Sequence, residues 1–206
     1  MTTQHASPPN PAPWAAVVPG MGPVRVDDLL TIPDDGYIYE VVEGVLVRMA
    51  GSGRTATILG LEIGAILRNY VRPRRLGRVT GSDGIYKFPG AETGLIPDAG
   101  FYTAERDATI PPDDADKPIP FAPNLAVEVA SPSQDANEMA AKARLYLSGG
   151  TRLVWILWPQ AQHIDVWHPE STAGPVATLN RSGTLDGEDV LPGFTYPVAE
   201  VFAALA

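Results

Sequence analysis

Two carboxylates and one amine stand out as side chains that could do chemistry together. Asp98 follows a proline, Glu128 lies thirty residues later in an apolar stretch, and Lys142 lies fourteen residues after that. Carboxylate oxygens are the ligands that magnesium prefers. An amine beside a bound phosphate can orient a nucleophile or offset developing charge. We therefore read this trio as the side chains that metal-assisted hydrolysis of a phosphodiester requires.

The strand that carries Glu128 indicates that this acid has a partner of opposite charge. Strand alternation over 124–130 places Leu125, Val127 and Val129 on one face and Glu128 on the other, between two alanines. A buried carboxylate without a partner is costly, so we expect a metal or a basic side chain next to it. An edge strand with one solvent-exposed face is the alternative interpretation of the same pattern.

Lys142 falls within the apolar face of a predicted helix. In the segment 135–147, Met139, Ala143 and Tyr146 are spaced as one helical stripe, and Lys142 lies inside that stripe. The spacing therefore predicts that Lys142 points toward the sheet rather than into water. The alternative is an exposed pair with the glutamate one turn earlier, which would contribute only about 0.2–0.5 kcal/mol.

The elements that must position these residues form an α/β pattern after a proline-rich start. Residues 1–24 contain six prolines and little apolar periodicity, which is typical of a disordered or loosely attached arm. Residues 25–206 are then one domain, long enough to bury a core. Helices are predicted at 26–31, 55–71, 135–147 and 198–205. Strands are predicted at 37–42 and 45–50, joined as a hairpin, and at 79–88, 101–102, 124–130, 153–157 and 163–167.

The composition restricts the class of protein. Hydrophobic residues make up 45% and charged residues 19%, as in ordinary globular proteins, and no apolar run approaches the length of a membrane span. The sequence contains no cysteine and its N-terminus lacks a secretory pattern, which fits a cytoplasmic protein. The three histidines do not have the HExxH spacing, so we do not expect a zinc enzyme.

The charge gives a mixed indication about nucleic-acid binding. A net charge of -9 argues against constitutive binding, because phosphate contacts supply most of the non-specific affinity. Five arginines nevertheless fall within eleven residues that contain no acid: Arg68, Arg72, Arg74, Arg75 and Arg78. This arginine cluster is either a phosphate-facing patch or a solvated helix end that complements the helix dipole.

Taken together, these residues resemble the Uma2 family, a branch of the PD-(D/E)XK nuclease superfamily. The resemblance extends over about 27–205, and its most specific part is the block 123–133, with valine-glutamate-valine-x-serine-proline-serine at its end, followed by Lys142 and Tyr146. Further matching segments are 39–44, 96–98, 153–155 and 186–194. The resemblance implies a restriction-endonuclease-like mixed β-sheet flanked by helices, and a homodimer that acts on DNA as an endonuclease.

The resemblance also implies roles for individual residues. It makes Asp98 and Glu128 ligands of Mg²⁺ or Mn²⁺, with the carbonyl of Val129 as a third ligand. Glu40 matches the early glutamate of the family, which implies that it binds or orients the metal. In the wider superfamily the catalytic lysine stands two residues after the glutamate, where this chain has an alanine. Lys142 would therefore reach the site from the helix.

Two other functions fit parts of the sequence. The segment Gly51–Ala56 matches G-x-G-x-x-A, the dinucleotide-binding fingerprint, although the strand before it is half of a hairpin rather than part of a βαβ unit. The second alternative is a catalytically silent nuclease fold that binds nucleic acid or a partner. In that protein Asp98, Glu128 and Lys142 would be a structural charge cluster. Metal binding distinguishes it from an enzyme.

Overall fold

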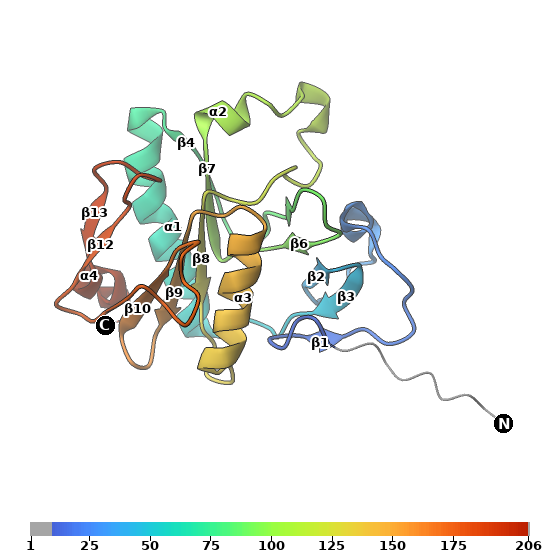
Figure 1. The fold of residues 1–206 in the computed structure, drawn as a ribbon, viewed down its shortest axis with the longest axis horizontal. Helices are drawn as coiled ribbons and strands as arrows, with labels where there is room; N and C mark the ends of the chain where they lie inside the picture. The colour runs from blue at the N-terminus through green and yellow to red at the C-terminus, as the bar shows by residue number, and fades with distance from the viewer. Residues whose placement is uncertain (1–9, 206) are drawn as a thin grey trace.

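A six-stranded mixed sheet forms the centre of the fold (Figure 1). The computed structural model describes residues 10–205. The strands follow the order β11-β10-β9-β8-β7-β4. Their bounds in that order are Ala177–Leu179, His163–Trp167, Leu153–Trp158, Leu125–Val129, Ala99–Thr103 and Gly77–Thr80. Only β8 and β9 run parallel, and all other neighbours are antiparallel. The predicted class, a mixed sheet flanked by helices, is confirmed.

The parallel pair is joined by α3 (Ala136–Ser148), the crossover that a parallel connection requires. Asp135 caps this helix: its side chain accepts hydrogen bonds from the backbone N–H groups of Asn137 and Glu138, and Glu138 reaches back to the N–H of Asp135. After the helix, Gly150 adopts a positive φ of 100° and turns the chain into β9. These local signals fix where Lys142 lies along α3.

Helices cover both faces of the sheet (Figure 1). The long helix α1 (Arg54–Arg74) packs Leu59, Ile63 and Leu67 into a core that also contains the β8 residues Leu125 and Val127. On the other face, α3 contributes Met139, Ala143 and Tyr146 to a second core that contains Ala126 of β8. Strand alternation therefore sets the two faces of β8, as predicted, and Glu128 is on the α3 side.

A second, five-stranded sheet lies beside the first, in the order β1-β3-β2-β6-β5. Its bounds in that order are Ala16–Val17, Val45–Arg48, Tyr39–Val42, Gly94–Leu95 and Tyr86–Lys87. The predicted hairpin is β2–β3, and its turn residues Glu43 and Gly44 both have positive φ, as a tight two-residue turn requires. The strand predicted at 79–88 is wrong as a single element. A turn closed by Gly84 N–H to Gly81 C=O splits it into β4 and β5, which join different sheets.

Short elements complete the chain. They are the 3-10 helices Val26–Thr31 and Pro112–Asp114, α2 (Ala104–Asp107), the antiparallel pair β12 (Thr184–Asp186) and β13 (Thr195–Pro197), and α4 (Val198–Ala203). Within residues 10–205, no helix is both long and apolar enough to cross a membrane.

The N-terminal segment differs from the loosely attached arm expected over 1–24. Residues 1–9 lie outside the described residues. From residue 10 onward the chain packs on the domain: Ala12 and Trp14 are buried, and Ala16 and Val17 form β1 against β3. Proline-rich composition lowers the apolar content of a segment, but the buried tryptophan and the pairing of β1 with β3 attach this one to the domain.

Candidate active site

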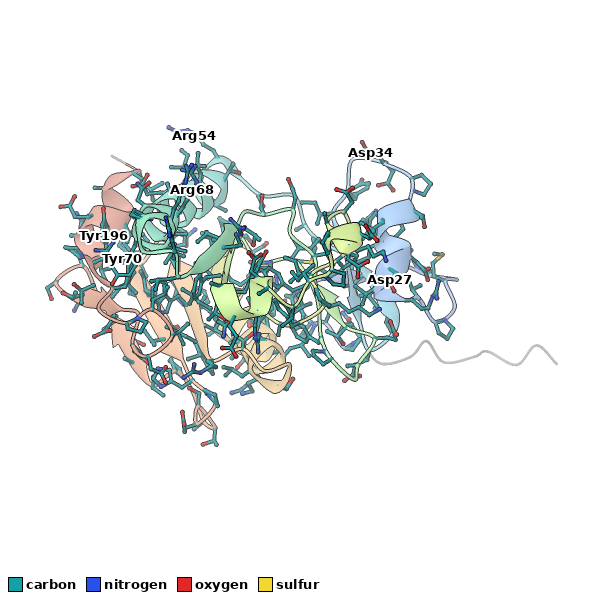
Figure 2. The ribbon with its side chains drawn as sticks, turned by 90° about the horizontal axis from the view of Figure 1, so that it is seen from above. Asp27, Asp34, Arg54, Arg68, Tyr70 and Tyr196 are labelled. Carbon is teal, nitrogen blue, oxygen red and sulfur yellow. The ribbon has the colours of Figure 1, made fainter. Side chains whose placement is uncertain are left out.

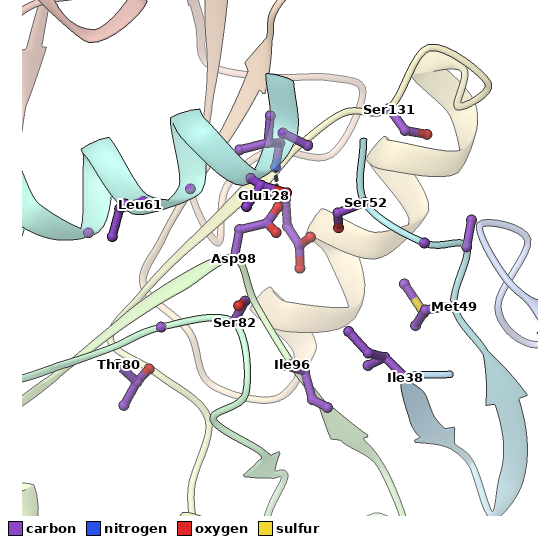
Figure 3. Close-up of a pocket in the computed structure, with 18 of the residues that line it drawn as sticks. Ile38, Met49, Ser52, Leu61, Thr80, Ser82, Ile96, Asp98, Glu128 and Ser131 are labelled. Carbon is purple, nitrogen blue, oxygen red and sulfur yellow. Dashed lines mark hydrogen bonds between the residues drawn. The ribbon is translucent and has the colours of Figure 1, made fainter. Parts of the chain in front are cut away.

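Antiparallel pairing of β7 and β8 brings Asp98 next to Glu128 (Figure 3). Ala99 is opposite Val127 in the last pair of this ladder, and Asp98 and Glu128 are the residues next to that pair on each chain segment. The backbone N–H of Val129 donates to Oδ2 of Asp98 over 2.7 Å and fixes the carboxylate against β8. Two residues thirty positions apart thus present their acids to the same place, as the sequence analysis expected.

Lys142 points from α3 onto this pair. Its side chain is 2% exposed, and its Nζ lies 2.8 Å from Oε1 of Glu128 and 3.4 Å from Oε1 of Glu40. The prediction that Lys142 faces the sheet is confirmed. The alternative pair with Glu138 does not form, because Glu138 caps the start of its own helix. One ammonium group is therefore shared between two buried carboxylates.

Tyr146 completes the surroundings of Glu128. It lies one turn after Lys142, is wholly buried, and donates its hydroxyl hydrogen to Oε1 of Glu128 over 2.7 Å. The sequence analysis counted Tyr146 as a member of the apolar stripe and missed this role of its hydroxyl. The available signal was a polar aromatic residue on the same helical face as an inward-pointing lysine.

Glu40 sits at the centre of the second sheet and does not face solvent. It is 0% exposed, and its Oε1 accepts the backbone N–H of Ile96 over 2.9 Å. Its Oε2 accepts the indole N–H of Trp14 over 3.2 Å. Glu40 is not among the residues that line the cleft described next. It contacts the site through Lys142.

A cleft with a volume of about 660 Å³ opens over the two acids (Figure 3). Asp98, Glu128, Val129 and Lys142 line its base. One wall is the face of α1 that carries small residues together with an exposed leucine and an arginine, namely Thr57, Gly60, Leu61, Gly64, Ala65 and Arg68. The charged cluster is therefore buried below and open to ligands above.

The glycine segment before α1 also lines this cleft, and its surroundings exclude the dinucleotide interpretation. Gly51 and Ser52 face the cleft, but β3 before them belongs to the antiparallel hairpin of the second sheet. The strand after α1, β4, belongs to the other sheet and pairs antiparallel with β7. No parallel βαβ unit surrounds Gly51–Ala56, so the alternative of a dinucleotide site there is wrong.

Burial and like charge set the protonation of the acids. Burial raises the pKa of Glu128 to about 7; Lys142 opposes this rise, whereas Asp98 and Glu40 add to it. Burial also raises the pKa of Asp98, against the hydrogen bond from Val129. Burial alone would lower the pKa of Lys142, but the carboxylates of Glu128 and Glu40 raise it above its ordinary value. Lys142 is therefore an ammonium group at neutral pH.

The free oxygens of the two acids fit a hard divalent cation. Among the described residues, nothing donates a hydrogen bond to Oδ1 of Asp98 or to Oε2 of Glu128. No group of three or more histidine, cysteine, aspartate or glutamate side chains within residues 10–205 is arranged to hold a metal ion. Magnesium is commonly bound by one or two carboxylates, with water and substrate oxygens in the other positions, so a pair of acids suffices.

The comparisons with known proteins bear on this arrangement. The sequence model of Uma2, described as "Putative restriction endonuclease", matches residues 26–199. The chain belongs to the Uma2 family. The resemblance seen in the sequence is thus confirmed, and the part matched to Uma2 includes Glu40, Asp98, Glu128 and Lys142.

A solved structure shares the fold of this Uma2 chain. It is described as a putative nuclease belonging to DUF820 from Anabaena variabilis ATCC 29413, and it matches with a TM-score of 0.72 at 18% sequence identity. The match covers 89% of this chain and 100% of that chain. No curated protein matched the sequence. At this identity the likeness establishes the fold.

The arginine cluster of this Uma2 chain divides into separate environments. Figure 2 shows Arg68 on α1 with Arg54, away from Asp27 and Asp34 near the other end of the molecule. Arg68 lines the cleft, and Arg72 is exposed one turn further along. By contrast, Arg78 pairs with Asp107, and Arg74 lies over the ring of Tyr70. Only part of the cluster is therefore placed to meet a ligand in the cleft.

Proposed function

We propose that this chain is a metal-dependent nuclease that hydrolyses phosphodiester bonds of DNA, with Mg²⁺ or Mn²⁺ held by Asp98 and Glu128. One observation carries the proposal: two adjacent carboxylates line an open cleft, each with an oxygen that has no hydrogen-bond partner among residues 10–205, and an ammonium group lies beside them. Membership of the Uma2 family supports it. Val129 also lines the cleft, and its carbonyl is the third metal ligand in this proposal.

The side chains divide the chemistry between them. A divalent cation held by the two acids would polarise the phosphate and lower the pKa of a bound water. Because the pKa of Lys142 is raised, this residue acts as a hydrogen-bond donor and positive charge rather than as a free-amine base. Tyr146 holds Oε1 of Glu128, so that the carboxylate keeps Oε2 toward the cleft. Glu40 keeps Lys142 in place from below.

The charge distribution supports weak, salt-sensitive binding of DNA. With a net charge of -9, the chain repels a polyanion except where arginines gather. Arg68 on the wall of the cleft and Arg72 on the next turn of α1 are exposed cations that would meet the phosphates of a strand entering the cleft along this helix. The homodimer remains a prediction from the resemblance, and sedimentation of the purified protein tests it.

A plasmid-nicking assay with Mg²⁺, Mn²⁺ and a chelator tests the proposal. We expect nicking only with a divalent cation, and we expect Asp98→Asn and Glu128→Gln to abolish it. Asp34→Asn is the matched control, because Asp34 is an exposed acid that does not line the cleft. If the two site variants nick as fast as the wild type, the active site is elsewhere. Cleavage of an RNA of the same sequence, with the plasmid intact, would correct the substrate.

A catalytically silent nuclease fold is the second candidate, and one observation favours it. Lys142 and Tyr146 already satisfy Oε1 of Glu128, and the cluster is almost wholly buried, as a structural ion network would be. The enzyme predicts that Mg²⁺ or Mn²⁺ raises the melting temperature, since a ligand that binds the folded state stabilises it. In the silent protein neither cation changes it. The same measurement on the double variant Asp98→Asn with Glu128→Gln shows whether a shift in melting temperature arises from metal bound at these two acids.

A further inference from the structure

We infer that Trp14 is a positioning residue: its indole N–H holds Glu40, and through Glu40 it holds Lys142 next to Glu128. The structural relationship concerns Lys142 itself, and its consequence for cleavage rests on the proposed function. Trp14 lies outside the part of the chain that matches Uma2, which begins at residue 26. The inference therefore gives the N-terminal segment a role in the site.

The contact between Trp14 and Glu40 is a buried, charge-assisted hydrogen bond. The two side chains are 5% and 0% exposed, and Nε1 lies 3.2 Å from Oε2. Among the described residues, Trp14 is the donor to Oε2, while Ile96 and Lys142 both contact Oε1. A buried carboxylate oxygen without a donor is costly. Loss of the indole N–H would therefore make Glu40 turn toward another donor.

Lys142 is the donor that Glu40 would compete for. The lysine is shared unequally, with 2.8 Å to Glu128 and 3.4 Å to Glu40. While the indole N–H donates to Oε2, the ammonium group makes only the longer contact, to Oε1 of Glu40. Without the indole, the same ammonium group becomes the nearest strong donor for both oxygens of Glu40. We expect Lys142 to shift away from Glu128 and from the base of the cleft.

The segment that carries Trp14 is held on the domain by its own contacts. The side chain of Asn10 accepts from the backbone N–H of Ala12 and donates to the carbonyl of Ala15. After this turn, β1 pairs with β3, and Val18 donates to the carbonyl of Leu46. Trp14 itself does not line the cleft. Its effect on a substrate must therefore pass through other residues.

Single-turnover and steady-state cleavage by the full-length Trp14→Phe protein give the first test. Phenylalanine keeps an aromatic ring but removes the N–H. We expect kcat to fall about tenfold, the lower end of the range for lost outer-shell partners, while KM stays unchanged because Trp14 does not touch the cleft. Trp167→Phe is the matched control. Trp167 is buried in the same core cluster, and within the described residues its indole N–H has no hydrogen-bond partner.

Combination with Glu40→Gln shows whether Trp14 acts through Glu40. In the Glu40→Gln protein, the further change Trp14→Phe should alter kcat by less than about twofold, because the route to Lys142 is already interrupted. If Trp14 only fills space in the core, its effect multiplies with that of Glu40→Gln. That result would overturn the inference.

A spectroscopic test reads the same coupling without cleavage. The chain has four tryptophans, so metal-free protein labelled with ¹⁵N gives four indole N–H resonances, and the one missing from Trp14→Phe belongs to Trp14. Changing Lys142 to Met should move the Trp14 resonance more than the other three. Lys142→Gln, which removes the charge but keeps a polar group, replaces this variant if the methionine protein does not fold.

The outcomes separate the inference from the proposed function. A Trp14 resonance that stays unchanged in the Lys142 variants overturns the inference, whatever the cleavage assay shows. If the Trp14 resonance moves in the Lys142 variants but the wild-type protein cleaves nothing, the proposed nuclease function is overturned and Trp14 remains the residue that positions Lys142. Active wild type with equal rates for Trp14→Phe and Trp167→Phe overturns the inference and leaves the nuclease intact.

Discussion

Tyr146 donates its hydroxyl hydrogen to Oε1 of Glu128 over 2.7 Å, and Lys142 contacts the same oxygen. Both donors thus meet one oxygen of the carboxylate, and Oε2 remains available to a ligand from the cleft. The arrangement sets the rotation of the carboxylate. It is therefore a direct point at which to test the proposed metal site.

Tyr146→Phe should weaken metal binding by about tenfold, because the carboxylate of Glu128 loses a donor that fixes its rotation. Removal of one buried hydrogen bond should also lower the free energy of unfolding by about 1–2 kcal/mol. A metal titration monitored by the melting temperature gives the affinity, and unfolding of the metal-free protein gives the change in stability. Tyr86→Phe is the control, because Tyr86 is buried and its hydroxyl is bonded to Thr80 rather than to either acid. Equal metal affinity in the two variants would contradict this role of Tyr146.

Lys142→Ala should lower the cleavage rate by about a hundredfold or more, the scale of a lost electrostatic or acid–base group. Metal binding should persist or tighten, because a positive charge is removed from beside a cation site. Nicking rates and metal titrations on the same preparation check this. The silent protein predicts a different result: no nicking before or after the change, and a loss of about 3–5 kcal/mol of stability from unpaired buried carboxylates.

The stability of the metal-free protein should fall as pH rises from about 5 to 8. Burial raises the pKa of Glu128 from its ordinary 4.5 to about 7, so the folded state binds this proton more tightly than the unfolded state. The resulting stabilisation is complete below about pH 4.5 and is lost as pH rises through about 7. Asp98, whose pKa is also raised, acts in the same direction.

Urea unfolding at several pH values in the presence of a chelator measures this change. We expect the wild type to lose about 2–3 kcal/mol more than Glu128→Gln across the window. Saturating Mg²⁺ should flatten the wild-type profile, because the cation binds ionised carboxylates. Parallel profiles for the two proteins would show that Glu128 is ionised throughout.

Replacement of Arg68 and Arg72 by alanine should weaken DNA binding and reduce the slope of log affinity against log salt by about one to two. Both arginines are exposed on α1, and Arg68 lines the cleft. Arg74→Ala is the matched control, since Arg74 lies over Tyr70 and donates to the carbonyl of that residue. Fluorescence anisotropy at several salt concentrations gives the slopes. An unchanged slope in the double variant would make these arginines a solvated helix end.

Local patterns were sufficient to predict much of the architecture. The hairpin at β2–β3, the helices α1 and α3 and the central strands β8 and β9 follow from periodicity and turn residues. The same periodicity predicted that Lys142 faces the sheet, because a charged residue inside an apolar stripe has no other direction available. The proximity of Asp98 to Glu128 needed the family resemblance, since strand order does not follow from spacing alone.

Long-range contacts were outside the reach of these patterns. The hydrogen bond from Trp14 to Glu40 joins residues that are 26 positions apart, and nothing in a proline-rich segment indicates where its one tryptophan will pack. The split of 79–88 between two sheets has the same cause. Each half has strand character, but the partner of each half is chosen by tertiary packing. Sequence separation rather than residue type limited the prediction.

The ion pair between Lys142 and Glu40 links elements that belong to different sheets, and this has a practical consequence for inactive variants. Glu40 is on β2 of the five-stranded sheet, whereas Lys142 reaches it from the helix that covers the six-stranded one. The charges proposed for catalysis thus also form an ion pair that holds the two sheets together. A variant made to trap a bound substrate should therefore keep the volume of the side chain it replaces. Asparagine, glutamine or methionine at these positions still fills the space between the two sheets, whereas alanine removes the reactive group and the packing between the sheets together.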